Sequence, residues 1–147
     1  MSEQQPEQQF GVQRIYVKDV SFESPQGVAL FGKPWKPAVQ QELATTTTAV
    51  NDDHYEVVLT VTVTGKMDDQ VAFVVEVKQA GLFLIKGLND GQMRQVMGIN
   101  CPSILFPYAR QVIDSMMVAG TLPPLMLPPI NFEALYQQMV EQQGAAH

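Results

Sequence analysis

The chain contains very little cysteine or histidine. Cys101 is the only cysteine, and the two histidines, His54 and His147, lie far apart in the sequence. An intramolecular disulfide is therefore excluded, and no Cys/His set has the spacing of a metal site. Nucleophilic catalysis needs a base beside serine or cysteine, and His54 falls in an expected turn. We therefore expect neither an enzyme nor a bound metal or other cofactor.

Basic charge is scarce as well. Nine basic side chains stand against 15 acidic ones, for a net charge of -6. A nucleic-acid partner is not expected, because phosphate binding needs a basic surface. The first residues, Met1 to Glu7, are polar and acidic, whereas an export signal is basic and then apolar, so we expect a cytoplasmic protein.

A long uninterrupted apolar run is the third feature that the sequence lacks. Residues 115–132 carry no charged side chain, but they include the proline pairs 123–124 and 128–129. A membrane-spanning helix needs about 20 consecutive apolar residues and tolerates such prolines poorly. We therefore expect this segment to face protein, without membrane insertion.

Alternation of side chains predicts strands at residues 12–22, 56–64 and 71–85, and the threonine-rich composition of residues 38–50, which lack a helical period, favours a fourth. Residues 24–37 are rich in proline and glycine and predict a long crossover loop. Ala80–Gly81 suggests a bend or bulge. The sides predicted to face inward are Val12, Tyr16, Val20 and Phe22; Val57, Leu59, Val61 and Val63; and Val71, Phe73, Val75 and Val77, with Ala72, Val74, Glu76 and Lys78 outward.

Helical spacing follows the strands. A weak helix is predicted from Asp90 to about Met97, and a second after Cys101-Pro102-Ser103, with Gly120 as its C-terminal cap. Pro107 should lie near the first turn of that second helix. A last helix begins at Asn131 as N-cap. The apolar stripe expected on the second helix is Leu105, Tyr108, Val112 and Met116, and that on the last helix is Phe132, Leu135, Tyr136, Met139 and Val140.

This order of elements predicts one α+β domain with an antiparallel sheet. The domain should span residues 10–141. Residues 1–9 are expected to form a disordered N-terminal tail, because they are polar and cannot repay the cost of ordering, and residues 142–147 a short C-terminal tail.

The segment between the last two helices is unusually apolar for a loop. Residues 121–130 hold four prolines beside Leu122, Leu125, Met126, Leu127 and Ile130. Such a loop covers its own core, a subunit contact or a groove for varied apolar chains. Three interpretations follow: a protein that binds apolar polypeptide segments, a carrier of a small apolar ligand, or a purely structural oligomer.

One strand face gathers acidic residues. Asp19, Glu23 and Glu76 surround Val74 on the predicted outward side. This arrangement predicts either a docking patch for a basic partner or an ordinary solvated face.

Long segments of the chain resemble the protein-export chaperone family SecB. They are Gln13 to Glu23, Tyr55 to Leu59, Cys101 to Arg110, and Pro128-Pro129-Ile130-Asn131-Phe132. The resemblance implies a four-stranded antiparallel sheet with helices packed on one side, assembled as a homotetramer, a dimer of dimers. It also implies an ATP-independent holdase that binds unfolded secretory precursor proteins and delivers them to the motor ATPase SecA.

The resemblance also implies site residues. The apolar groove for precursors would include Leu122, Leu125, Met126, Leu127, Ile130 and Phe132. SecA would dock on Asp19, Glu23, Val74 and Glu76, and Val75, Val77 and Gln79 would affect tetramer assembly. Family members often carry a longer C-terminal tail that contacts SecA; this sequence departs from that pattern at Gly144-Ala145-Ala146-His147, and the resemblance leaves the second contact open.

Overall fold

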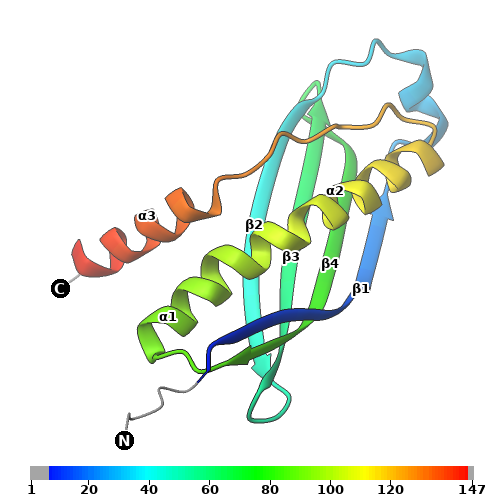
Figure 1. The fold of residues 1–147 in the computed structure, drawn as a ribbon. Coiled ribbons are helices and arrows are strands. Elements are labelled where there is room, and N and C mark those ends of the chain that lie inside the picture. The colour runs from blue at the N-terminus through cyan, green and yellow to red at the C-terminus, as the bar shows by residue number, and fades with distance from the viewer. Residues whose placement is uncertain (1–6, 146–147) are drawn as a thin grey trace, which may run out of the picture.

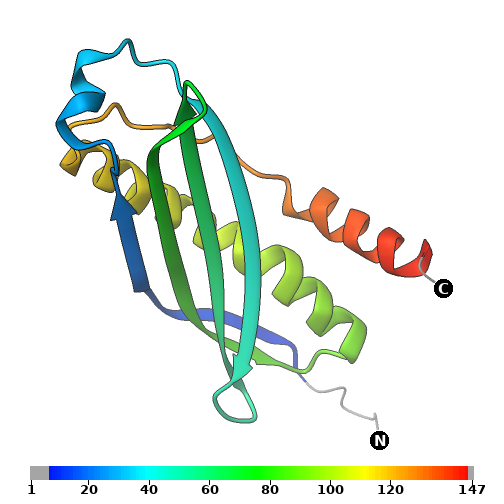
Figure 2. The same cartoon turned by 180° about the vertical axis from the view of Figure 1, so that it is seen from behind.

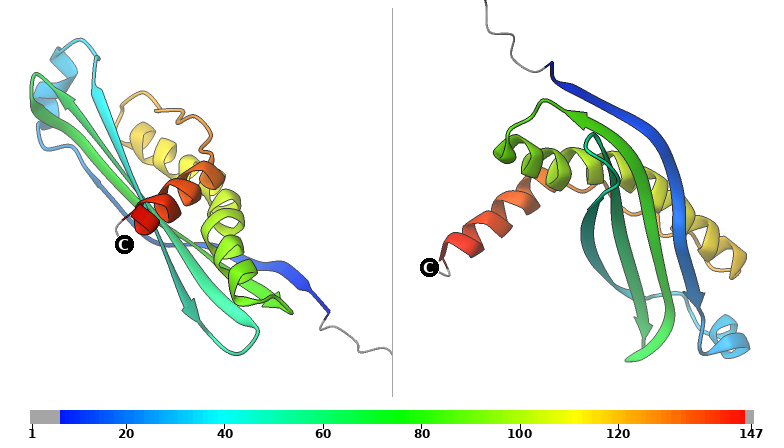
Figure 3. Two further views of the ribbon diagram at one scale, coloured as in Figure 1. Left: turned by 90° about the vertical axis from the view of Figure 1, so that its left-hand side faces the viewer. Right: turned by 90° about the horizontal axis from the view of Figure 1, so that it is seen from below.

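The computed structural model describes residues 7–145 and consists of one antiparallel sheet with helices on one of its faces (Figures 1 and 3). The strands are β1 (Gln9–Glu23), β2 (Ala38–Ala49), β3 (His54–Met67) and β4 (Gln70–Lys86), in the order β1-β4-β3-β2. The predicted fold class is confirmed. The predicted N-terminal tail falls mostly on residues 1–6, outside the described residues, and β1 begins at Gln9.

A long crossover joins the two edge strands. Because β1 and β2 lie at opposite edges of the sheet, the chain between them must pass around its end (Figure 2). The crossover includes the 3-10 helix η1 (Gly27–Gly32), whose Leu30 is buried, and Trp35 stacks on Phe73 of β4 at 5.9 Å between ring centroids. The predicted crossover loop is thus confirmed.

The alternation predicted for β3 and β4 is present almost throughout. Val57, Leu59, Val61 and Val63 are fully buried, as are Phe73, Val75 and Val77, because these side chains face the helices. Ala72 is also fully buried, contrary to its predicted outward position. Gly65 pairs with Phe73 and Lys66 with Val71, so Ala72 is the extra residue of a bulge that interrupts the alternation.

Ala80–Gly81 forms neither a bend nor a bulge, since both residues keep a regular register with both neighbouring strands. Gly81 instead allows the helix layer to approach. A Cβ at this position would lie 2.6 Å from the Phe83 ring and 3.1 Å from the Leu105 side chain. The prediction of a bulge was wrong because close packing, rather than backbone geometry, requires the glycine.

Two bulges in β1 correct the predicted faces of that strand. Its pairing with β4 skips Gln13 and Lys18, and each skipped residue reverses the alternation. Phe10, Val12, Ile15, Val17, Val20 and Phe22 therefore share the helix side, since their β4 partners do. Tyr16, predicted to lie with Val12 and Val20, pairs with Ala80 and faces the other side.

The helical segments between residues 90 and 119 form one nearly continuous rod. α1 (Asp90–Gln95) begins with a capping box between Asn89 and Gln92, and a π-helical turn, η2 (Val96–Asn100), connects it to α2 (Cys101–Ala119). The prediction of two separate helices was wrong. The wider turn, in which the Cys101 amide donates to the Val96 carbonyl, precedes Pro102 and accommodates a residue that has no amide to donate. Pro107 consequently lies inside α2.

The buried face of α2 also differs from the predicted stripe. Leu105, Ala109, Ile113 and Met117 are fully buried, whereas Tyr108 is 48 % exposed. Leu105 belongs to both stripes, and after it the buried stripe is turned by one position from the predicted one.

Gly120 is the C-cap of α2, as predicted, but the left-handed residue that completes the turn is the next one, Thr121. The Thr121 amide donates to the Val118 carbonyl and the Leu122 amide to the Met117 carbonyl, the two bonds of a Schellman motif. Thr121 adopts the left-handed conformation with φ 57°, while Gly120 has φ −83°. Gly120 is required for space, because a Cβ there would lie 2.7 Å from the Phe22 ring.

The chain then runs through residues 121–131 without regular structure and ends in α3 (Phe132–Ala145). Asn131 is the predicted N-cap, since its Oδ1 accepts a bond from the Ala134 amide at 3.0 Å. α3 projects beyond the β2 edge of the sheet (Figures 1 and 2). It continues through Ala145, so the predicted C-terminal tail is helical at least that far, and residues 146–147 lie outside the described part.

Candidate functional site

An apolar groove of about 900 Å³ lies between α3, η2 and β2. α3 supplies most of its lining, and three of these side chains remain widely exposed: Leu135 (41 %), Met139 (47 %) and Val140 (47 %). The remaining lining comes from Leu43, Ala44, Thr45 and Thr47 of β2, Arg94 of α1, Met97 and Gly98 of η2, and Phe132, Tyr136 and Gln143 of α3.

Two aromatic contacts hold α3 against the rest of the domain. Phe132 is buried and meets Phe106 of α2 edge-on, with 6.1 Å between ring centroids. Tyr136 lies against Gly98, where a Cβ would come within 2.7 Å of its ring. The π-helical turn therefore provides a flat backbone seat for the ring, and this seat defines one end of the groove.

The residues predicted to form an apolar groove take different positions. Leu122 and Leu127 are buried in the core, Leu125 and Ile130 are half-buried, and only Met126 is widely exposed, at 74 %. Of the six, Phe132 alone lines the observed groove. Four of the five leucine, methionine and isoleucine side chains of the loop therefore pack, fully or in part, against this chain's own core.

Sequence reasoning missed most of the groove. The stripe predicted on the last helix, Leu135, Tyr136, Met139 and Val140, was the available signal, because a short terminal helix has little else to cover. Leu43 could not have been assigned, since its contribution depends on β2 lying beside α3.

The four residues of the predicted acidic patch lie together on the bare face of the sheet. The register places Glu23 beside Val74, and Ser21 beside Glu76. Thr62 donates to the Glu76 carboxylate at 2.9 Å. The row Ser21, Glu76, Thr62 continues to Glu42 of β2, which extends the acidic patch and was not predicted.

Beside the acidic patch, Glu56 is partly neutralised. Lys18 donates to its carboxylate at 2.7 Å, and the Tyr16 hydroxyl donates to its other oxygen. These bonds, from Lys18 first and then from Tyr16, lower the pKa of Glu56. Burial, followed by the bond to Glu56, raises the pKa of Tyr16 to about 12. Glu56 of β3 is thus connected to β1 across β4, whose small residue Ala80 pairs with Tyr16.

Three residues of β4 were predicted to affect assembly: Val75, Val77 and Gln79. All three are buried within this chain. They pair with Phe22, Val20 and Val17 of β1. The Gln79 side-chain amide donates to the Tyr16 carbonyl beside the Lys18 bulge, and its Oε1 has no partner. Any effect on assembly must therefore pass through the shape of β1.

β1 itself exposes an apolar strip on the helix side of the sheet. Phe10, Val12, Val17 and Val20 are 38–44 % exposed there, on an edge strand. An exposed apolar edge of this kind is typical of a subunit contact.

Catalytic and metal-binding groups are not assembled in the described residues. Burial raises the pKa of the Cys101 thiol to about 12, so the reactive thiolate is suppressed at neutral pH. Within residues 7–145, no three His, Cys, Asp or Glu side chains are placed to hold a metal ion. In the same range, no helix has the length and apolar character needed to cross a membrane.

Comparisons with known proteins agree with this architecture. The model of the family described as "Preprotein translocase subunit SecB" matches residues 3–143. The protein-export protein SecB of Pseudomonas savastanoi pv. phaseolicola is 53 % identical over 138 residues, which cover 94 % of this chain and 85 % of that protein. The SecB of Hahella chejuensis is 52 % identical over 136 residues, covering 92 % and 86 % respectively.

A solved structure shares the fold. The Mycobacterium tuberculosis SecB-like chaperone Rv1957, determined in complex with a ChAD peptide from the HigA1 antitoxin, superimposes with a TM-score of 0.70 at 15 % identity, covering 82 % of this chain and 90 % of that one. Taken with the sequence matches, which span nearly the whole domain, this places the chain in the SecB family of protein-export chaperones, a chaperone family and not an enzyme family.

Proposed function

We propose that this protein is an ATP-independent holdase that binds unfolded secretory precursors and delivers them to SecA. The observation that carries the proposal is the apolar groove beside α3, whose lining includes one charged side chain, Arg94, among the described residues. A surface of this composition suits extended apolar segments of many sequences, because flexible methionines adapt to different side chains. The peptide bound by the M. tuberculosis chaperone supports the same kind of ligand.

The affinity would come from apolar burial and from backbone contacts. Each 100 Å² of apolar surface removed from water contributes about 2.5 kcal/mol before the cost of ordering the chain. A single short segment would therefore bind weakly. A long precursor that occupies equivalent grooves of several subunits would gain avidity without any strong single contact.

Assembly as a homotetramer, a dimer of dimers, would provide those several grooves. The exposed apolar strip of β1 is the surface that favours such a contact. Val75, Val77 and Gln79 would affect it indirectly, because they pair with Phe22, Val20 and Val17 of β1. The loop leucines that line no groove in one chain, Leu122, Leu125 and Leu127, would serve precursor binding through the core that they stabilise.

SecA would dock on the acidic patch, defined as Asp19, Glu23, Val74, Glu76 and the newly added Glu42. The patch lies on the bare face of the sheet, whereas the groove lies on the helix side. Figure 3 shows that the helices lie on one side of the sheet. Precursor and motor would then occupy the same subunit at separate surfaces. The meeting with SecA would take place in the cytoplasm, before the precursor crosses the membrane.

The decisive experiment is size-exclusion chromatography with light scattering, on the protein alone and mixed with a slowly folding precursor diluted from denaturant. We expect a tetramer that comigrates with the unfolded precursor and ignores its native form. A tetramer that ignores both forms would contradict the holdase proposal and favour a purely structural oligomer. Uptake of a small apolar ligand without precursor binding would favour a carrier.

Charge reversal tests the separation of the two surfaces. Asp19→Lys combined with Glu23→Lys should abolish binding to SecA, because like charges across an interface cost several kcal/mol. Precursor binding should remain unchanged. Surface plasmon resonance with each partner measures both, and Asp52→Lys combined with Asp90→Lys, two exposed carboxylates outside the patch, is the control for the same change in net charge. Equal loss of SecA and precursor binding would contradict the proposed roles.

A further inference from the structure

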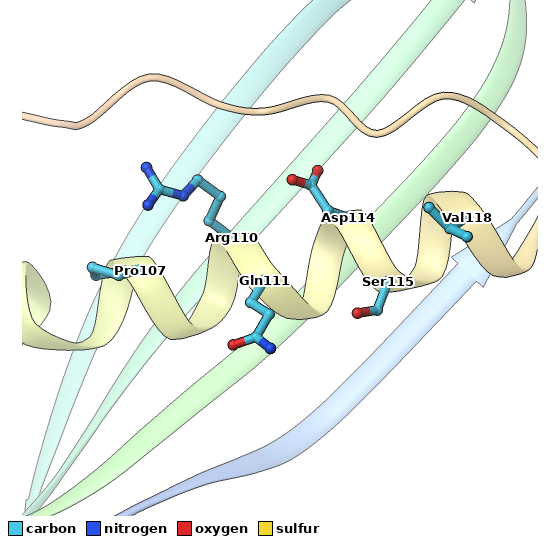
Figure 4. A pocket seen from close by; sticks show the side chains of 6 residues that line it. All are labelled: Pro107, Arg110, Gln111, Asp114, Ser115 and Val118. Carbon is cyan, nitrogen blue, oxygen red and sulfur yellow. The ribbon is translucent and has the colours of Figure 1, made fainter.

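The two charged side chains of an otherwise uncharged stretch both bind the same loop. From residue 95 to residue 131 the only charged side chains are Arg110 and Asp114, one helical turn apart on α2. Figure 4 shows them on the side of α2 that faces the loop of residues 121–130, whereas Gln111 and Ser115 extend to the opposite side. The stretch thus retains charge only where the loop passes over the helix.

Asp114 makes the stronger connection. Its Oδ1 accepts hydrogen bonds from the amides of Leu125, at 2.9 Å, and Met126, at 3.2 Å. Arg110 adds a longer bond, 3.4 Å, from its guanidinium to the Leu127 carbonyl. These three consecutive residues have no regular secondary structure, so side chains of α2 satisfy backbone groups that a helix or sheet would otherwise satisfy.

The clamped segment contains a strained residue. Met126 has φ 52°, in the left-handed region that a side chain other than glycine or asparagine rarely adopts. Such a conformation persists only where the surroundings hold it. The paired amides of Leu125 and Met126 on one carboxylate oxygen provide that restraint.

The result is a fixed presentation of one apolar side chain. Leu127 is buried and Leu125 half-buried, while Met126 is 74 % exposed. The loop leads into Phe132, which lines the groove beside α3. A precursor segment leaving the groove along the loop would pass Ile130 and the exposed prolines 129 and 128, and would then reach Met126.

We propose that Asp114 is a positioning residue for precursor binding: by holding the left-handed conformation of Met126, it presents this side chain on the loop that leads into the groove. The proposal rests on the holdase function proposed above. Without the carboxylate, Met126 relaxes to a negative φ, and the loop leaves the presenting conformation for most of the time. The apparent affinity then falls in proportion to the fraction of time that the loop spends in the presenting conformation.

Three variants of the full chain test this proposal. Asp114→Leu keeps the approximate shape and removes the acceptor. Asp114→Asn keeps an Oδ1 acceptor and removes the charge. Gln111→Leu, the matched control, adds an apolar side chain on the opposite side of the same helix. For each variant, the tetramer mass and thermal midpoint establish folding, hydrogen exchange reports on the amides of Leu125 and Met126, and titration with unfolded precursor gives the affinity.

We expect Asp114→Leu to lose amide protection and to bind precursor about tenfold more weakly. Without the restraint, the left-handed conformation of Met126 becomes unfavourable, and the presenting loop is populated about tenfold less. Asp114→Asn should retain both properties to within about twofold, because its carbonyl oxygen still accepts. Gln111→Leu should resemble the wild type in both.

Other outcomes overturn the proposal. If Asp114→Leu loses protection but binds as tightly as the wild type, presentation of Met126 does not matter. If Asp114→Asn keeps protection but binds as weakly as Asp114→Leu, charge rather than loop geometry is responsible. If the wild type ignores the precursor, the holdase function fails, and the positioning role fails with it, whereas unchanged amide protection in Asp114→Leu refutes the clamp alone.

Discussion

The end of α2 offers the sharpest test of the structural reasoning, because two adjacent residues should respond to substitution in opposite ways. Thr121 occupies the left-handed position at φ 57°, and Gly120 does not. A left-handed conformation costs an ordinary residue about 1–2 kcal/mol. Thr121→Gly removes that cost, and the greater freedom of glycine in the unfolded chain returns about 0.4–1 kcal/mol of it.

The expected net effect of Thr121→Gly is a stabilisation of about 0.5–1 kcal/mol. For a domain of this size, it should raise the thermal midpoint by about 1–4 °C. Gly120→Ala should have the opposite effect. Its φ of −83° suits alanine, but the new Cβ would lie 2.7 Å from the Phe22 ring, and overpacking of this kind costs about 1–3 kcal/mol.

Denaturant unfolding of the two single variants, followed by circular dichroism, provides the measurement. A double-mutant cycle then separates steric crowding from backbone strain. In a Phe22→Leu background the ring that Gly120→Ala meets is gone, so the two substitutions should be strongly non-additive. If Thr121→Gly destabilises the protein, or if Gly120→Ala costs the same in both backgrounds, then the left-handed conformation belongs to Gly120, and its assignment to Thr121 is refuted.

Two further predictions concern the sheet and the groove. The pKa of Glu56 is lowered by Lys18 and Tyr16, so its stabilisation is complete above the ordinary carboxyl pKa of about 4.3 and is lost as the pH falls through the lowered value. Because Lys18 is half exposed, the amplitude should be about 0.2–1 kcal/mol, and Glu56→Gln should flatten the acid side of a stability-against-pH curve; an unchanged acid limb would contradict this connection of Glu56 to β1. Gly98→Ala should displace Tyr136 and weaken precursor binding, while the thermal midpoint changes by no more than a few degrees. Unchanged affinity in a precursor titration would show that the seat of α3 does not shape the groove.

The sequence predicted correctly those elements whose side chains follow one period. β3 and much of β4 alternate apolar and polar residues, and the structure buries the predicted sides. Asp19, Glu23, Val74 and Glu76 of the acidic patch could also be grouped from the sequence, because β1 and β4 keep a regular register between residues 19–23 and 74–78, whereas Glu42 of β2 was missed. Local pattern is sufficient where neighbouring strands pair without interruption.

Other features depended on contacts that no local pattern records. The bulges at Gln13 and Lys18 move Tyr16 to the other face, and nothing in the sequence marks those two residues as unpaired. The π-helical turn joins two helices that Pro102 was expected to separate. The groove requires β2, η2 and α3 to meet, so Leu43 and Met97 acquire their roles only from the tertiary arrangement.

The two bulges of β1 have a consequence for how far association can spread. If Gln13 and Lys18 are left out, residues Phe10 to Glu23 form an unbroken alternation of apolar and other side chains. A strand with that uninterrupted pattern, exposed at a sheet edge, would template open-ended pairing from one molecule to the next. Each inserted residue instead bends the strand and breaks the ladder, which confines pairing to short stretches. Deleting both residues should therefore leave every native strand pair available and convert the proposed tetramer into polymers, which size-exclusion chromatography would detect.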